Sequence, residues 1–205
     1  MFKIRMFLRF EKEEKWLEQM AAKGWLLRGT GLCYRFQKTE PGERTIKLDF
    51  RYFKSARDFT EYRTLFADSG WQHLAGSRWS GTQYFLKSRA DSTEDIFSDR
   101  LSQASRYQRA ADMGLCCAMA FLVLFLTIVS NEQIDSAAFF QPKQWYFTPG
   151  LWELEGVSFW WAFLFESPFA IMRGVGWLLP LLFMVFYGVC AMKAHLIYRA
   201  AVSGQ

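Results

Sequence analysis

The chain has 205 residues, enough for one domain of ordinary size and a small membrane module. Its formal net charge is +5, but residues 1–88 alone hold 17 Lys and Arg against 10 Asp and Glu, a net +7 that leaves the remainder mildly acidic. This division predicts a basic N-terminal head, residues 1–88. A helical linker and a membrane part are expected to follow it, from the apolar segments described below.

The head begins with a predicted strand over residues 2–8, where apolar and charged side chains alternate so that one face would be buried. The continuous apolar core of a cleavable signal peptide is missing there. Residues 11–23 show helical spacing, with acids in the first turn that complement the helix dipole, and Gly24 follows in the role of a left-handed cap. Trp25 opens a hairpin whose second strand includes residues 32–37.

The same order of elements is predicted again 46 residues later, over a strand at 46–53 and a helix that Ser55 caps. Gly24 and Trp25 recur as Gly70 and Trp71, and the second hairpin is about three residues longer than the first. We interpret the pattern as a duplicated βαββ unit, an α+β ferredoxin-like sandwich with an extra strand in each half. The alternative is chance spacing of common residues.

Basic residues alternate with the core positions of the predicted strands and would lie on the sheet face away from the helices: Lys3, Arg5, Arg35, Lys47 and Arg51. Anionic lipid headgroups attract such residues by about 1 kcal/mol each. A basic sheet with aromatic residues also resembles RNA-binding sheets. Here the aromatic residues follow the alternation of the core, so we expect a lipid- or partner-facing surface and not nucleic-acid binding.

Catalytic motifs are missing from the sequence, which has no GxSxG, HExxH, GxxxxGK[ST] or GxGxxG string. The four cysteines form no CxxC pair, and the neighbouring Cys116 and Cys117 in a helix would make a poor disulfide or metal pair. His73 is the only histidine of the head, and a histidine in a strand beside a turn usually has a structural role or is exposed. We therefore expect no catalytic residue, no cofactor and no metal site.

Residues 89–112 form a predicted helical linker, which either pairs with a second copy as a stalk or lies along the head or bilayer. Residues 113–129 contain no charge and no proline. As a helix they would be about 26 Å long, close to the hydrocarbon thickness of about 30 Å. We predict a membrane domain over residues 113–205, with spans at about 113–130 and 175–195.

An aromatic, acidic segment, residues 131–174, joins the two predicted spans. Positive residues precede the first span and follow the second, which favours cytoplasmic N- and C-termini in the cell membrane. Residues 157–172 are nearly long enough for a third span, but Glu166 and Pro168 make a crossing costly, so we favour a re-entrant or interfacial hairpin. Glu166 is a candidate intramembrane polar site; the alternative is a carboxylate at headgroup depth, facing water.

Several segments of the chain are similar to a known family. They are the string LRFEKEEKWLEQMAAKGW, a YRF strand, a PGE turn, a KLDF strand and the later DSGW and EDIFSD segments. Together they resemble a family of bacterial membrane proteins of unknown function, which is often encoded beside PadR-type transcriptional regulators. The resemblance covers roughly residues 1–109. It implies a bacterial inner-membrane location and a regulatory neighbourhood, and it supplies no catalytic residues.

Two classes of function fit these predictions. The first is a membrane-anchored regulatory or interaction protein with a cytosolic ligand- or partner-binding domain. The second is an accessory subunit of a membrane transporter or channel complex, assembled through its spans. In both, we expect the lipid bilayer and a protein in the membrane, or a second copy of the chain, as partners.

Overall fold

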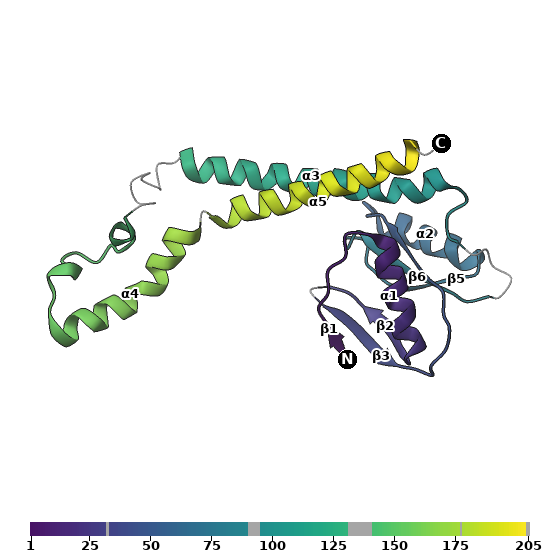
Figure 1. The fold of residues 1–205 in the computed structure, drawn as a ribbon, viewed down its shortest axis with the longest axis horizontal. Coiled ribbons are helices and arrows are strands. Elements are labelled where there is room, and N and C mark those ends of the chain that lie inside the picture. The colour runs from purple at the N-terminus through teal and green to yellow at the C-terminus, as the bar shows by residue number, and fades with distance from the viewer. Residues whose placement is uncertain (32, 90–94, 131–140, 177, 204–205) are drawn as a thin grey trace. The chain divides into compact units, whose positions relative to one another are not determined.

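The computed structural model describes residues 1–31, 33–89, 95–130, 141–176 and 178–203 (Figure 1). They form two compact units, one of residues 1–113 with 190–205 and one of residues 114–189. The elements of the head are β1 (Phe2–Lys3), α1 (Phe10–Ala22), β2 (Trp25–Gly29), β3 (Tyr34–Lys38), β4 (Ile46–Phe50), α2 (Ala56–Asp68), β5 (Trp71–Ala75) and β6 (Thr82–Lys87). They are followed by α3 (Arg100–Ser130), the short 3₁₀ helices η2 (Pro142–Trp145) and η3 (Leu151–Glu153), α4 (Gly156–Gly176) and α5 (Leu178–Ser203).

The head is an α+β structure with two three-stranded antiparallel sheets, in the orders β1-β3-β2 and β4-β6-β5. The two sheets have matching registers. Trp25 pairs with Lys38 in the first, and Trp71 pairs with Lys87 in the second, so the partners are offset by 46 and 49 residues. Both sheets also have a bulge at the same place, after Leu27 in one and after His73 in the other. The three extra residues therefore lie between the strands of the second hairpin.

Glycines end both head helices, as their sequence positions predict. Gly24 and Gly70 have φ values of 80° and 82°, in the left-handed region that glycine adopts without steric cost. A Cβ at Gly24 would lie 2.9 Å from the carbonyl oxygen of Thr39. The chain therefore reverses directly from α1 into β2 and from α2 into β5.

The larger hydrophobic core lies between α1 and both sheets. Leu17 and Met20 of α1 pack in one cluster with Leu27 of the first sheet and with Ile46 and Leu48 of the second. Each of these side chains is almost completely buried, and each contributes about 1.5–3 kcal/mol of transfer free energy on burial. A smaller cluster around Tyr62 of α2 and Phe85 of β6 belongs to the second sheet alone. The helix of the first half thus stabilises the sheet of the second half.

The predicted N-terminal strand is much shorter than residues 2–8. Only Phe2 and Lys3 pair with β3, while Ile4 and Met6 are 87% and 68% exposed. Phe7 leaves the sheet and packs its ring 5.2 Å from that of Trp16 on α1. The strand pairing therefore ends at Lys3, because contact with α1 replaces it from Phe7 onward. The predicted buried face is wrong along its whole length, since Phe2 is also 71% exposed.

Two helices, α3 and α5, are long and apolar enough to cross a membrane. Only 11% and 6% of the residues in the most apolar 18-residue stretches of these helices are buried, so most side chains there are exposed. Within the second unit, the ring of Phe121 on α3 stacks on Phe183 and Tyr187 of α5, with centroids 5.1 and 5.8 Å apart. Residues 157–172 form part of one helix, α4, with Pro168 inside it.

Candidate functional site

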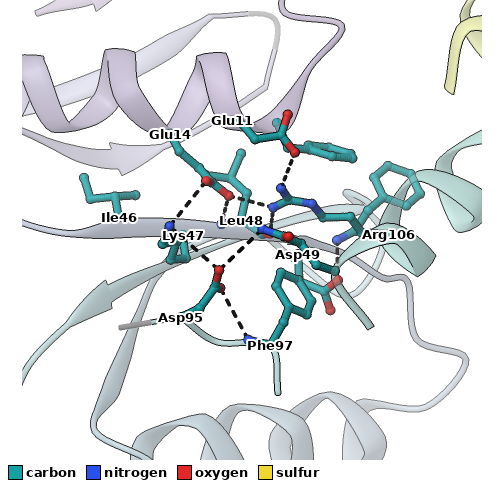
Figure 2. Close-up of polar contacts among 12 residues, drawn as sticks. Glu11, Glu14, Ile46, Lys47, Leu48, Asp49, Asp95, Phe97 and Arg106 are labelled. Atoms are coloured by element: carbon teal, nitrogen blue, oxygen red, sulfur yellow. Dashed lines mark hydrogen bonds and ion pairs between the residues drawn. The ribbon is translucent and has the colours of Figure 1, made fainter. Parts of the chain in front are cut away.

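Strand β4 is an edge strand, because the sheet order is β4-β6-β5, and one side of it has no strand partner among the residues that the structure describes. Acidic side chains of α1 bind the backbone N–H groups on that side, and Figure 2 shows Glu14 beside Leu48. The N–H of Ile46 donates to Glu18 at 3.2 Å, and the N–H of Leu48 donates to Glu14 at 3.1 Å. The carboxylates of α1 therefore accept the hydrogen bonds that the carbonyl groups of a neighbouring strand would otherwise accept.

The carbonyl groups of the same edge are bound by arginines of α3. Arg106 Nη1 donates to the carbonyl oxygen of Leu48 at 2.8 Å, and Arg109 Nε donates to that of Phe50 at 2.6 Å. The spacing of the two carbonyls follows the period of two in a strand, and the two arginines lie one helical turn apart. The open edge is thus satisfied by side chains from two helices that are far apart in the sequence.

Arg106 is the centre of this arrangement and is completely buried. Its Nη1 lies 2.6 Å from a carboxylate oxygen of Glu14, and its Nη2 lies 2.7 Å from one of Glu11 (Figure 2). The guanidinium also lies 5.0 Å from the ring centroid of Phe10 and 5.3 Å from that of Phe97. Burial alone would lower the pKa of Arg106, but the two carboxylates outweigh it and raise the pKa further, so the side chain stays charged.

Neighbouring charges extend the arrangement along β4. Arg109 Nη2 lies 2.6 Å from a carboxylate oxygen of Asp49, which is itself buried. On the other side, Lys47 Nζ lies 3.8 Å from Glu14 and 4.0 Å from Asp95. We call Glu11, Glu14, Asp49, Arg106 and Arg109 the α3 clamp, because they hold the first turns of α3 to α1 and β4.

Tyr107 adds a contact between α3 and the first turn of α1. Its hydroxyl donates to Glu11 at 2.6 Å and accepts the N–H of Phe10 at 3.0 Å. Burial alone would raise the pKa of Glu11, but this hydrogen bond and the charge of Arg106 hold it below its usual value. Glu11, one of the acids in the first turn that complement the helix dipole, therefore also binds α3.

A second buried acid, Glu13, joins α1 to both sheets. One of its carboxylate oxygens accepts hydrogen bonds of 2.7 Å from the hydroxyls of Tyr34 on β3 and Tyr84 on β6. Burial raises the pKa of Glu13, and the two hydroxyls oppose this shift by stabilising the charged form. Glu13 is thus the polar counterpart of the shared hydrophobic core.

The comparison with protein families covers the clamp. The family described as protein of unknown function (DUF2812) matches residues 9–119. The chain belongs to this family. The matched range begins at α1, ends within α3 and includes every residue of the α3 clamp. No curated protein and no solved structure matches the chain. The predicted membership of a family of unknown function is confirmed, and the PadR neighbourhood stays a prediction.

The basic residues predicted to share one sheet face lie in different environments. Lys47 belongs to the edge of β4 and faces the acids described above. Lys3 Nζ contacts the sulfur of Met20 at 3.5 Å, Arg5 lies over the rings of Phe7 and Trp16, and Arg51 lies over that of Tyr62. Arg35 lines a basic cavity together with other arginines.

Glu166, the candidate intramembrane acid, is 6% exposed on α4. Its carboxylate accepts the backbone N–H groups of Phe147 and Thr148, with a distance of 3.0 Å to Thr148. The hydroxyl of Tyr146 forms a hydrogen bond of 3.0 Å with that of Ser167, the residue after Glu166. Glu166 therefore holds the segment after η2 against α4, and Gly174 makes room on the same helix for the indole of Trp145.

Sequence reasoning missed the clamp, although its acids left a signal. Glu11 and Glu14 of the clamp recur with Glu18 at spacings of three and four, which places all three on one face of α1. The almost completely buried Leu17 lies three residues after Glu14, so that face points toward the core. A buried carboxylate requires a cation or hydrogen-bond donors, and the first turns of α3 supply two arginines. In the ranges that the structure describes, no His, Cys, Asp and Glu group could hold a metal ion.

Proposed function

We propose that the chain is a membrane-anchored regulatory or interaction protein, in which a cytosolic head binds a ligand or a partner and transmits this event to the membrane helices. The observation that carries the proposal is the α3 clamp. Arg106 is completely buried among groups of the head, and the helix that contains it continues to Ser130 through an apolar segment. A change in the head at α1 or β4 would therefore act directly on that helix.

An exposed aromatic residue of the head supports an interaction role. Trp79, in the loop between β5 and β6, is 66% exposed, and the guanidinium of Arg78 lies 4.4 Å from its ring centroid. Tryptophan and arginine are the residue types that contribute most to binding energy in protein interfaces. A large ring left in water next to an arginine is thus consistent with a contact that the isolated chain lacks.

The finer membrane arrangement belongs to the same proposal. We place α3 and α5 across the bacterial inner membrane as a multi-pass anchor, with both termini in the cytoplasm, where Arg100, Lys193 and Arg199 favour them. We also propose that the two halves of the head are a duplicated, ferredoxin-like unit. Their matching registers and bulges support a common origin.

Site-specific photo-crosslinking in the native membrane tests the proposed function. A benzophenone amino acid would replace Trp79 in the head or, as the matched position in the membrane part, Trp161, which is 74% exposed on α4. Adducts between position 79 and another protein, retained in alkali-washed membranes, support a regulatory or interaction role. Recovery of the chain in the aqueous fraction would overturn it.

The second candidate function, an accessory subunit of a transporter or channel, rests on the outer face of α4. Phe165 and Trp161 are 75% and 74% exposed there. Rings exposed on a membrane helix face either lipid or another helix. This candidate predicts adducts from position 161 with a multi-span membrane protein and none from position 79. The same experiment therefore separates the two functions.

A further inference from the structure

A cavity of about 410 Å³ lies where the two sheets of the head meet. Strands β2 and β5, labelled in Figure 1, contact each other across this junction. The cavity is lined by Gly29 and Ala75, which are the corresponding bulge positions of the two strands. Bulges often re-aim side chains and end strand pairing beside functional sites. The cavity is thus formed by the same irregularity in both halves.

The lining of this cavity is strongly basic. Arg28 comes from β2, Arg35 from β3 and Arg63 from α2, and His73 of β5 lies among them. No acidic side chain is found among the described residues of the lining. None of the three arginines forms an ion pair with a described carboxylate, whereas the arginines of the α3 clamp each do. Three positive charges are therefore gathered without a matching acid in the described chain.

The histidine is oriented by its neighbours. Gln83 donates from its amide nitrogen to the carbonyl oxygens of Arg51 and Ser77, at 3.2 and 2.8 Å, so its Oε1 is an acceptor. His73 Nε2 lies 3.0 Å from that oxygen and must carry the proton, which leaves Nδ1 to gain or lose one. Burial and the charge of Arg63 lower the pKa of His73.

Arg35 is held close to the backbone of the cavity. A Cβ at residue 29 would lie 3.2 Å from its Nη2, so the guanidinium rests directly over Gly29. Guanidinium groups donate in a planar fork that matches phosphate oxygens, and several of them around one cavity favour an anion with more than one charge. The ring of Phe59 also lines the cavity and offers an apolar contact beside the charges.

We propose that this cavity binds a phosphate group carried by a small organic molecule or by an anionic lipid headgroup, with Arg28, Arg35 and Arg63 as its ligands. A volume of about 410 Å³ falls within the usual range for small-molecule sites and exceeds what a lone phosphate needs. The inference rests on the proposed function for its biological use, because it names the ligand that the head would sense. The binding itself depends only on the cavity.

The test uses the full chain in nanodiscs of zwitterionic phosphatidylcholine. Pyrophosphate is titrated at low ionic strength by calorimetry, and hydrogen exchange is followed in peptides covering residues 28–35 and 71–77. A second set of nanodiscs contains phosphatidylglycerol and no pyrophosphate. Arg35→Gln and Arg63→Gln remove single charges from the cavity. Arg57→Gln, on the same helix as Arg63 but 85% exposed and outside the lining, is the matched control.

Tight binding of pyrophosphate that Arg35→Gln and Arg63→Gln each weaken by about tenfold, with Arg57→Gln unchanged, supports a soluble phosphate ligand. Protection of the same peptides only in phosphatidylglycerol, lost in the two cavity variants, supports a lipid headgroup. The proposal is overturned if neither anion protects these peptides, or if Arg57→Gln has the same effect as the cavity variants. Because crosslinking from Trp79 needs no added anion, failure here is distinguishable from failure of the proposed function.

Discussion

Replacing Arg106 with methionine should destabilise the head more than any exposed substitution. Methionine fills much of the volume of the arginine stem but supplies no charge and no donor. The change leaves Glu14, which is 6% exposed, next to β4 without its strongest partner, and it leaves the carbonyl oxygen of Leu48 without its donor. Glu11 is less affected, because its side chain is 45% exposed and water can solvate it.

The size of the loss follows from these contacts. Removing one member of a buried ion pair costs about 3–5 kcal/mol, because the other charge stays buried and uncompensated. A domain of this kind has a total stability of about 5–15 kcal/mol, so the loss is a large share of the total. Adding Glu14→Gln should restore part of the loss. Glutamine is neutral, and its carbonyl oxygen can still accept the N–H of Leu48, which Glu14 binds at 3.1 Å.

Urea unfolding of the full chain in detergent measures the free energy of the head, and hydrogen exchange at Ile46 and Leu48 reports the edge of β4. We expect the stability order wild type, then Arg106→Met/Glu14→Gln, then Arg106→Met. The exposed pair of Arg57 and Glu61 supplies the control, and Arg57→Gln should leave the midpoint unchanged. A loss below about 1 kcal/mol for Arg106→Met, or a double variant less stable than the single one, would refute the reasoning.

Three further predictions concern other parts of the chain. Gly24→Ala should lower stability by about 1–2 kcal/mol in the same urea assay, because the residue has a φ of 80°. The pKa of His73 is lowered in the folded head, so its contribution to stability should be complete above its ordinary pKa of 6.5 and fall as the pH drops below it. In His73→Gln this pH dependence of the urea midpoint should disappear. Glu166→Leu should speed hydrogen exchange at Phe147 and Thr148, whereas Glu166→Gln, which keeps an acceptor, should speed it less.

Helix limits and turns were predictable because local chemistry determines them. The predicted helix over residues 11–23 differs by one residue from α1 at each end, since the spacing of Trp16, Leu17 and Met20 and the following Gly24 act within a few residues. The longer second hairpin was also visible, because its strands keep the alternation of the first. These features need no knowledge of distant contacts.

Features that depend on distant contacts were not predictable. The pattern of residues 2–8 has the period of a strand. The strand pairing stops after Lys3, because the ring of Phe7 packs against Trp16 on α1. Arg106 and Glu14 are 92 residues apart, and the sequence contains no local sign that they meet. Lys47 followed the alternation of an exposed face, yet its ammonium reaches toward Glu14 because β4 is an edge strand beside α1.

The edge of β4 is held by ion pairs and not by apolar packing, and this affects how α3 is positioned. A buried ion pair is weak evidence of added stability, since well-packed apolar groups can stabilise an interface as much. Ion pairs do, however, discriminate between alternative positions of α3 along β4. The carbonyl oxygens of Leu48 and Phe50 each accept from one arginine, so a slip of α3 by one turn would leave Glu14 or Asp49 buried beside no cation. The clamp therefore fixes the residue at which α3 leaves the head, and the length of apolar helix that follows is fixed with it.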